Sequence, residues 1–401
     1  MEKNIIPVLL GADLNCYSVA RAFHEAFGVT SYAFGRYASG ETSHSSIISF
    51  KTVKELDRES VMLEVLVGFA KKHSADELYL IACTDGYQRA VIKNKEFLQK
   101  YYFCVCPSAD IEKKLRTKEA FLEACRKYSL PCPKTVVLKN GDEIPEELGF
   151  SYPVIIKPSD SAAYWRTPFK GMKKVYTAHD GSEARKIIGD IYSAGYSGSM
   201  ILQELIPGGD SAVYVLTAYC DTQSTVRMLC MGHVLLGEHT PKGLGNHVAV
   251  ITEYHPSFMK KISDFLEKIK YTGFANFDIM LDPRDGEFKL LEVNLRQGRS
   301  NYYVTASGIN IAELAVRDKR SDFTDEKYIC EKESFWHTVP KNIVYKMTED
   351  AELVKKARKL VKKGRSKTAL FYAKDMLRDP LRSAYVLIHN ARYYKKYRIH
   401  G

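Results

Sequence analysis

Three polar residues alternate along an apolar segment in the second half of the chain. In "KLLEVNLRQGRSNYY", residues 289–303, Glu292, Asn294 and Arg296 stand at every second position. Side chains of a β-strand alternate between its two faces, so a strand here directs all three to one side. Asp278 lies on the preceding apolar segment, and a turn between the two segments brings its carboxylate near Glu292.

These oxygen-bearing side chains suit a hard metal ion. Two carboxylates at close range repel each other unless a cation lies between them. Asp278, Glu292 and Asn294 offer only oxygen ligands, which favour Mg²⁺ or Mn²⁺ and leave coordination positions for water and phosphate. The alternative is the solvated face of an antiparallel sheet, where polar residues alternate for that reason alone. The segment therefore predicts a metal site, with an exposed sheet face as the competing interpretation.

Two lysines upstream of this segment stand where a cation can meet phosphate oxygens. Lys118 opens a predicted helix, and Lys157 ends the predicted strand of "YPVIIKP". An ammonium group in such a position can bind phosphate as a point charge. Each lysine taken alone is more often a surface residue, so the pair gains meaning only from the rest of the chain.

The stretch "QELIPGGD" offers groups that can hold a nucleoside. Glu204 is an acceptor for an amino group, and the backbone of Leu205 and Ile206 follows it directly. Asp210, at the end of the stretch, is an acceptor for ribose hydroxyl groups. Each of these signals is weak by itself, and their order along the chain carries the information.

The first part of the chain alternates between strand-like and helix-like segments. The predicted strands and helices are, in order, "NIIPVLL", "SVARAFHEAFG", "VTSYAFG", "VMLEVLVGFAKKH" and "ELYLIACTDG". They predict a small doubly wound α/β domain, in which ligand loops follow the carboxyl ends of strands. Residues 11–15 and 84–86 are therefore candidate pocket walls, with plain turn chemistry as the alternative. No GxGxxG motif occurs, so a dinucleotide site has little support.

From about residue 113 the pattern changes to a helix and longer apolar strands. "TKEAFLEACRKYSLPCPKTVVL" predicts a helix, a proline-bracketed turn and a strand. "SMILQELIPGGDSAVYVLTAYCD" predicts two strands joined by a glycine-rich hinge. "GFANFDIMLDPRDGEFKLLEVNLR" predicts a β-hairpin, which would position the polar residues of the metal site.

The order of these features resembles the ATP-grasp superfamily. The features that carry the resemblance lie within about residues 113–315. They are, in order, Lys118, Lys157 followed by proline after an apolar strand, "QELIPGG", Asp278 on one strand and "EVNLR" on the next. The resemblance implies an α/β ATP-grasp fold with an N-terminal Rossmann-like pre-ATP-grasp domain and a helical, basic C-terminal extension. The domains expected on this basis are residues 1–112 (N-terminal α/β), 113–200 (ATP-grasp lid), 201–325 (metal and catalytic subdomain) and 326–401 (extension).

The resemblance also implies a role for each polar residue. Lys118 and Lys157 are implied to bind the phosphates of ATP. Glu204 and the backbone of Leu205 and Ile206 are implied to bind the adenine, and Asp210 the ribose. The residues implied to bind two Mg²⁺ ions, or Mn²⁺ in their place, are Asp278, Glu292 and Asn294. Arg296 is implied to stabilise the transferred phosphoryl group or a substrate carboxylate. One departure is the lid loop "SDSAAYWRTPFKG", which is less rich in glycine than in related ligases.

The implied reaction joins a carboxylate to an amine. The carboxylate attacks the γ-phosphorus of ATP to give an acyl phosphate and ADP, and the amine then attacks the acyl carbon to give an amide and phosphate. Within the superfamily, "NLRQGRSNYYVTASGIN" and the basic C-terminal extension look most like the D-aspartate ligases of peptidoglycan synthesis. The implied partners are an amino acid and the side-chain amine of a nucleotide-linked muropeptide. Arg299, Ser300 and Tyr302 are the substrate-side candidates, and ordinary packing is the alternative for Tyr302 and Tyr303.

The positive charge of the chain is confined to its end. Residues 341–401 contain 17 Lys and Arg against 5 Asp and Glu, so they account for the whole net charge of +11. This excess indicates an anionic partner or a solvated helical face. Because of this excess, one alternative to the ligase is a protein whose basic tail binds a membrane surface or, less readily, nucleic acid.

A second alternative is an ATP-binding protein that uses the same nucleotide pocket without turnover.

Composition indicates a globular protein of two or three domains, with 45% hydrophobic and 27% charged residues among 401. The apolar run near the N-terminus is too short for a signal peptide or a membrane span, so we expect a cytoplasmic protein. The nine cysteines include no CxxC pair, which indicates reduced structural thiols rather than a zinc site.

Overall fold

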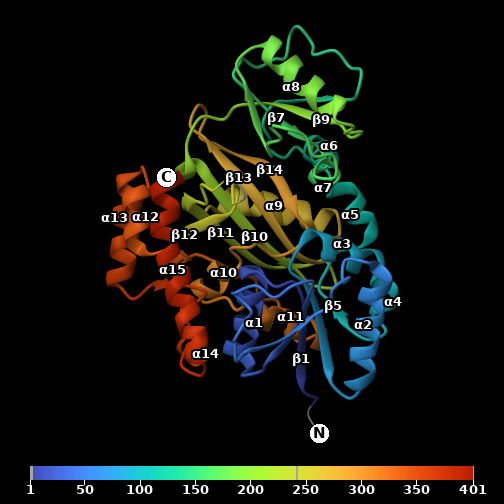
Figure 1. Cartoon of the computed structure of the whole chain (residues 1–401), viewed down its shortest axis with the longest axis vertical. Helices are drawn as coiled ribbons and strands as arrows, with labels where there is room; N and C mark the ends of the chain where they lie inside the picture. The colour runs from blue at the N-terminus through green and yellow to red at the C-terminus, as the bar shows by residue number, and fades with distance from the viewer. Residues whose placement is uncertain (1–2, 241–242, 401) are drawn as a thin grey trace. The chain divides into compact units, whose positions relative to one another are not determined.

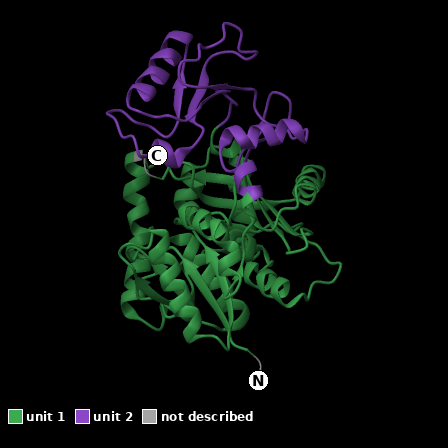
Figure 2. Ribbon diagram, turned by 90° about the vertical axis from the view of Figure 1, so that its right-hand side faces the viewer, with its two compact units in different colours: residues 1–109, 209–277, 294–401 green, residues 110–208, 278–293 purple. Residues whose placement is uncertain are grey.

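The computed structural model describes residues 3–240 and 243–400, and the chain divides into two compact units. Unit 1 comprises residues 1–109, 209–277 and 294–401, and unit 2 comprises residues 110–208 and 278–293 (Figure 2). The second segment of unit 2 is the outer part of one β-hairpin. Figure 1 labels the elements along the chain. The four-part division expected from the sequence stays a prediction.

The first five strands of unit 1 form a parallel sheet with the order β3-β2-β1-β4-β5. Its strands are β1 (Ile5–Leu10), β2 (Ser31–Gly35), β3 (Ile48–Thr52), β4 (Glu77–Ala82) and β5 (Phe103–Cys104). Its helices are α1 (Leu14–Phe27), α2 (Glu59–Lys72), α3 (Asp85–Lys93) and α4 (Lys95–Leu98). β1 and β4 are neighbours at the topological switch point of the sheet, so the loops that follow them meet at its carboxyl edge.

The predicted doubly wound domain is confirmed, and two of its strands were missed, β3 and the two-residue β5. α1 begins where the Asp13 side chain accepts a hydrogen bond from the Cys16 N–H, and it ends at Gly28, whose φ of 68° is left-handed. The end of the helix at Gly28 was predicted, whereas its beginning was predicted four residues too late, at Ser18. β3 is an edge strand with mostly half-buried or exposed residues, and its sequence "ISFKT" lacks the apolar run that identified the other strands.

The second sheet of unit 1 follows the order β14-β13-β10-β11-β12-β16-β17, and β15 also pairs with β11. Its long strands are β10 (Val213–Cys220), β11 (Val226–Gly237), β12 (His247–Glu253), β13 (Gly273–Asp282) and β14 (Glu287–Asn294). Its short strands are β15 (Tyr328–Ile329), β16 (Phe335–His337) and β17 (Ser366–Lys367). The helices nearest these strands in sequence are the 3-10 helix η1 (Asp210–Ala212), α9 (Pro256–Lys268), α10 (Tyr302–Ser307) and α11 (Ile311–Arg320). The unit boundary runs through the predicted β13–β14 hairpin, which is confirmed.

The basic C-terminal extension is helical, as the resemblance implies. Its helices are α12 (Lys341–Met347), α13 (Ala351–Lys362), α14 (Ala373–Met376) and α15 (Pro380–His400). β16 and β17 join the extension to the large sheet through β12, so it is an integral part of unit 1. Among the described residues, no helix is both long and apolar enough to cross a membrane.

Unit 2 contains a four-stranded antiparallel sheet with the order β6-β9-β7-β8. Its strands are β6 (Thr135–Leu138), β7 (Val154–Pro158), β8 (Tyr176–Ala178) and β9 (Met200–Glu204). Its helices are α5 (Ala109–Leu115), of which the first residue belongs to unit 1, α6 (Lys118–Lys127), α7 (Ser161–Tyr164) and α8 (Gly181–Ser193). Apolar residues of the sheet and of α8 form its core, among them Val154, Ile156, Ile188 and Leu202.

The nine cysteines are free thiols, and eight of them are buried, with Cys132 partly exposed. This agrees with the expectation of reduced structural cysteines. Burial raises the pKa of the Cys106 thiol to about 11, so this side chain is a protonated apolar group at neutral pH.

Candidate active site

An ion pair joins the first residue of α6 to β14. The Lys118 ammonium lies 2.8 Å from Oε2 of Glu292 and donates a hydrogen bond to Ser161 Oγ at 3.3 Å. The positive charge of Lys118 holds the pKa of Glu292 well below its usual range, against the effect of burial. Burial alone would lower the pKa of Lys118, but Glu292 and then Asp278 outweigh it and raise this pKa. The surface-lysine interpretation is therefore wrong for Lys118, and both groups of the pair are ionised at neutral pH.

Lys157 is a second buried cation in the same unit. Its side chain is 9% exposed, and its Nζ donates to Oε1 of Gln203 at 2.9 Å. Burial, together with the neighbouring charge of Lys118, lowers the pKa of Lys157 to about 8, although Glu292 and Asp278 act in the opposite direction. The surface interpretation is wrong here too. An anion beside these two ammonium groups would stabilise the charged form of Lys157, which fits the predicted contact with phosphate.

Glu204 is held by the turn of the β13–β14 hairpin. Its Oε1 accepts a hydrogen bond from the Lys134 N–H at 2.7 Å, and its Oε2 lies 2.8 Å from the Arg284 guanidinium. Arg284 also binds Asp282 at 2.6 Å. Ile206 is buried, whereas Leu205 is 37% exposed. Glu204 was predicted from the sequence as a site residue. Arg284 was not, because in the sequence it is one of several polar residues in a turn.

The predicted metal ligands lie on the two strands of this hairpin. Glu292 and Asn294 are two residues apart on β14, so their side chains leave one face of the strand. Asp278 stands on β13, and its charge acts on both Lys118 and Lys157. The Asn294 amide lies 3.5 Å from the Asn276 carbonyl. Ionised carboxylates and an amide oxygen have the donor chemistry that Mg²⁺ prefers, so the residues fit the ion. The metal assignment stays a prediction.

In unit 1, Arg296 forms a two-pronged ion pair with the first residue of α3. Its Nε and Nη2 donate to the two carboxylate oxygens of Asp85 at 2.7 and 2.9 Å. Its Nη1 donates to the Gln297 carbonyl. Asp85 belongs to the loop 84–86 that was named as a candidate pocket wall. The pair fixes the plane of the Arg296 guanidinium at the carboxyl edge of the first sheet.

The segment that follows β14 is fastened to the same edge by amide side chains. The bonds run from Gln88 Nε2 to the Leu295 carbonyl (2.6 Å), from Gln297 Nε2 to the Ala82 carbonyl (3.1 Å), from Asn15 Nδ2 to the Cys83 carbonyl (2.9 Å) and from Asn301 Nδ2 to Asn15 Oδ1 (2.8 Å). The segment thus contacts both predicted pocket walls. Sequence analysis missed Gln88 and Gln297, because their partners are distant backbone groups that leave no motif.

One guanidinium nitrogen of Arg299, Nη1, is buried without a hydrogen-bond partner among the described residues. Burial raises the pKa of the Asp13 carboxyl, and the charge of Arg299, followed by that of Arg296, partly offsets this effect. Both arginines therefore act on the loop that follows β1.

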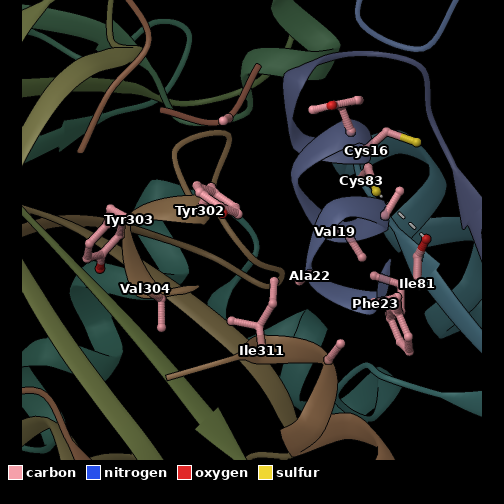
Figure 3. Packing of buried hydrophobic residues seen from close by; sticks show 14 of the residues in the cluster. Cys16, Val19, Ala22, Phe23, Ile81, Cys83, Tyr302, Tyr303, Val304 and Ile311 are labelled. Atoms are coloured by element: carbon pink, nitrogen blue, oxygen red, sulfur yellow. Dashed lines mark hydrogen bonds between the residues drawn. The ribbon is translucent and has the colours of Figure 1, made fainter. Parts of the chain in front are cut away.

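Two further predicted residues have partners inside unit 1. Tyr302 lies in the buried cluster of Figure 3, where its hydroxyl donates to Glu25 at 2.8 Å and the Arg21 guanidinium stacks 4.3 Å from its ring centre. Ser300 is also buried. These contacts favour the packing alternative for Tyr302.

Asp210 begins η1 and is held from two sides. Its Oδ2 accepts hydrogen bonds from the Gly237 N–H at 2.6 Å and from His239 Nε2 at 2.9 Å. The side chain keeps 34% exposure. Its predicted contact with a ribose stays a prediction.

No protein-family model matches the chain. Solved structures nevertheless share its fold. The L-amino acid ligase of Bacillus licheniformis aligns with 80% of this chain and 77% of its own, at a TM-score of 0.55 and 13% identity. The ADP complex of N5-carboxyaminoimidazole ribonucleotide synthetase aligns with 84% of this chain and 81% of its own, at a TM-score of 0.59 and 12% identity. The biotin carboxylase domain of Hydrogenobacter thermophilus 2-oxoglutarate carboxylase was solved with MgADP, ADP and bicarbonate. It aligns with 80% of this chain and 71% of its own, at a TM-score of 0.58 and 13% identity.

This fold is the ATP-grasp fold that the sequence resemblance implied. The D-aspartate ligase of Enterococcus faecium (strain Aus0004) is 39% identical over 387 residues, which are 93% of this chain and 92% of that protein. The chain belongs to the D-aspartate ligase family. It is an ATP-dependent carbon–nitrogen ligase that joins a carboxylate to an amine, and the predicted enzyme class is confirmed.

Proposed function

We propose that this ligase joins the carboxylate of an amino acid, D-aspartate first, to the side-chain amine of a nucleotide-linked muropeptide through an acyl phosphate. The observation that carries the proposal is the charged group of Lys118, Lys157 and Glu292 in unit 2. It supplies two cations and an ionised carboxylate in one place, which is the combination needed to bind polyphosphate together with a metal ion. The E. faecium relative, a D-aspartate ligase, supports the choice of amino acid.

The nucleotide would be held mainly by residues of unit 2. Lys118 and Lys157 would contact phosphate oxygens, Glu204 and the backbone of Leu205 and Ile206 would bind the adenine, and Asp210 of unit 1 would bind the ribose. When bound, ATP supplies the phosphoryl group that activates the carboxylate. Two Mg²⁺ ions, or Mn²⁺ in their place, would be held by Asp278, Glu292 and Asn294 and would neutralise phosphate charge.

The lysines prepare this site before any ligand binds. Lys118 keeps Glu292 ionised, which is the form that a metal ion requires. The pKa of Lys157 is about 8, so its ammonium group loses its proton more readily than an ordinary lysine does. Phosphate oxygens near its Nζ favour the protonated form, so binding of the nucleotide would fix a full positive charge at the point where negative charge accumulates during transfer.

Arginines of unit 1 are suited to the carboxylate substrate. Asp85 fixes the Arg296 guanidinium, which would face the reacting carboxylate or the transferred phosphoryl group. Arg299 would use its unpartnered Nη1 to bind a second carboxylate of the amino acid, since a guanidinium binds carboxylates through charge-assisted hydrogen bonds. Ser300 is the next candidate. Tyr302 is the weakest, since its hydroxyl already binds Glu25.

The acyl phosphate can be tested by isotope transfer. D-Aspartate labelled with ¹⁸O in its carboxylates is incubated with ATP, Mg²⁺ and a lysine-containing muropeptide, and the released phosphate is analysed by mass spectrometry. One ¹⁸O atom per phosphate is expected, because the carboxylate oxygen that attacks phosphorus leaves with it. Unlabelled phosphate alongside amide product would reject the acyl phosphate. The absence of any product would favour the alternative, an ATP-binding protein without turnover.

A further inference from the structure

Helix α15 is apolar on its inner side. Val386, Tyr393 and Tyr397 are buried, and Tyr393 and Tyr397 share a core cluster with residues of α12 and α13. Arg382 is completely buried and binds Asp375 at 2.9 Å. Figure 1 shows α12, α13 and α15 side by side. The helix is thus a firmly seated part of unit 1, and its orientation toward solvent is fixed.

The outer side of α15 is apolar as well. Five large side chains on it are half or more exposed: Leu381 (60%), Leu387 (57%), Ile388 (53%), Tyr394 (50%) and Ile399 (58%). At roughly 100° per residue they fall within about half of the helix circumference. Large apolar side chains that gather on an exposed face of a folded protein mark an interaction site, so this face predicts a partner.

The charges on this outer side all have one sign. Arg392, Lys395 and Arg398 are exposed among the apolar residues and form no ion pair with any described residue. The sequence from Pro380 to His400 contains five Lys and Arg and no Asp or Glu. We call the five apolar residues and these three cations the α15 face. Its partner must therefore be both apolar and anionic.

A hollow beside the α15 face has the same character. It lies between α12 and α15, has a volume of about 490 Å³ and is lined by Ile343, Lys346, Met347, Ala391, Tyr394, Lys395, Tyr397 and Arg398. Three of these side chains are cations and none is a carboxylate. Apolar walls under a basic rim fit an acyl chain below an anionic headgroup.

We propose that the α15 face docks on an anionic lipid surface. Aliphatic side chains enter the boundary between headgroups and acyl chains, and the three cations meet the headgroup phosphates. A second copy of the chain is a poorer partner, because a two-fold interface would bring the same cations against each other. Nucleic acid is poorer too, because Leu387, Ile388 and Ile399 find no stacking partner there.

Vesicle co-sedimentation of the full chain tests this. Wild-type protein should bind vesicles of phosphatidylglycerol and phosphatidylcholine in equal parts at least tenfold more tightly than vesicles of phosphatidylcholine alone. Two variants probe the two kinds of contact: Leu387→Glu with Ile388→Glu, and Arg392→Gln with Lys395→Gln and Arg398→Gln. At low salt, each variant should lose at least tenfold in affinity for the anionic vesicles. At high salt the charges are screened, so the variant with the three Gln substitutions should bind like wild type, whereas the variant with the two Glu substitutions should still bind more weakly.

Matched controls change equal numbers of exposed residues elsewhere in unit 1. Tyr37→Glu with Phe97→Glu, and Lys51→Gln with Lys54→Gln and Lys71→Gln, should bind like wild type. Circular dichroism and ligase activity without vesicles verify that each α15 variant is folded. Wild-type protein that ignores anionic vesicles, or α15 variants that bind them like the controls, would overturn the proposal. So would a wild-type dimer in light scattering that Leu387→Glu with Ile388→Glu converts to monomer, since that result identifies a second copy as the partner.

Discussion

The ammonium of Lys118 and the carboxylate of Glu292 form a 2.8 Å ion pair between α6 and β14. The two residues come from distant parts of the chain, and each was expected at a phosphate or metal site before the fold was known. The charge of Lys118 holds the pKa of the partly buried Glu292 carboxyl well below its usual range, so Glu292 stays ionised. The pair is therefore the contact through which the nucleotide and metal assignments can be tested together.

Glu292→Gln should abolish turnover while the protein stays folded. The glutamine amide can still accept a hydrogen bond from Lys118, but it lacks the charge that holds Mg²⁺. We expect kcat to fall by about a hundredfold or more, since even indirect supports of a metal site are worth 10- to 100-fold. Steady-state ADP release measures this. Glu287→Gln, at the exposed start of β14, is the matched control and should behave like wild type, whereas normal turnover in Glu292→Gln would refute the metal assignment.

Lys157→Met should weaken ATP binding about tenfold or more without lowering stability in the absence of nucleotide at pH 7. Methionine fills the buried space, and the removed ammonium is a desolvated charge that costs free energy in the folded state. Isothermal titration calorimetry and urea unfolding give the two quantities. Wild-type affinity for ATP in the variant would exclude Lys157 from the phosphate site.

The lowered pKa of Lys157 also predicts a pH dependence. The folded-state value is about 8 and the ordinary value is 10.5, so between these pH values the unfolded chain binds more protons. The free energy of unfolding should therefore rise with pH in this window through Lys157, and the unfavourable effect of the charge is complete below pH 8. The difference between wild type and Lys157→Met, measured by urea unfolding from pH 7 to 10, should shrink as pH increases. A difference that does not vary with pH would contradict the shift.

Asp85→Asn should lower kcat/KM about tenfold and leave stability within about 1 kcal/mol of wild type. Asp85 is 65% exposed, so its ion pair adds little to folding, but it fixes the plane of the Arg296 guanidinium. Kinetics with varied amino acid, together with thermal unfolding, separate the two effects. Asp57→Asn, which breaks the exposed pair with Arg36, is the control. Equal kinetics for the two variants would mean that Asp85 does not position Arg296 for catalysis.

Arg382→Met should destabilise unit 1 by about 3–5 kcal/mol, because it leaves Asp375 as a buried carboxylate without its cation. Asp375 also accepts hydrogen bonds from Tyr17 and Ser46, which hold it in place and prevent its escape to water. Urea unfolding gives the difference. Arg398→Met, an exposed change on the same helix, should alter the free energy of unfolding by no more than about 0.5 kcal/mol. A loss below 1 kcal/mol for Arg382→Met would show that water or a neighbour replaces the cation.

The basic extension should draw an acidic acceptor toward the protein. Lys355→Gln with Lys362→Gln and Lys363→Gln should raise KM for a nucleotide-linked muropeptide and flatten its dependence on salt, with KM for ATP little changed. Lys356 is left intact, because it already binds Glu253 at 2.7 Å and Glu333 at 2.9 Å. Kinetics at low and high salt measure the effect. An unchanged salt slope would mean that these lysines form a solvated helical face only.

The sequence contained enough information for the fold, whereas the roles of the site residues stay predictions. The alternation of Glu292 and Asn294 on one strand, and Gly28 at the end of α1, are local signals, and local rules interpret them. The partners of these residues are not local. Arg284 binds Glu204, Asp85 binds Arg296 and Gln203 binds Lys157 only once segments far apart in the sequence come together in the fold.

Register explains one of these pairings. β7 and β9 are antiparallel, with Ile155 opposite Gln203 and Lys157 opposite Ile201, so Lys157 and Gln203 are diagonal neighbours on one face. No single-sequence pattern states that register. Tyr302 was a substrate candidate with packing as the alternative, and its burial where α10 packs against α1 favours packing.

The most direct test of the central claim is ADP release by the wild-type chain with amino acids and amines supplied separately and together. With ATP and Mg²⁺ present, we expect sustained ADP release only when a carboxylate substrate and an amine acceptor are both added, with D-aspartate and a lysine-containing muropeptide as the most active combination and Glu292→Gln inactive. ADP release that needs neither substrate, or that persists unchanged in Glu292→Gln, would contradict the assignment of this chain as a carboxylate–amine ligase acting through this site.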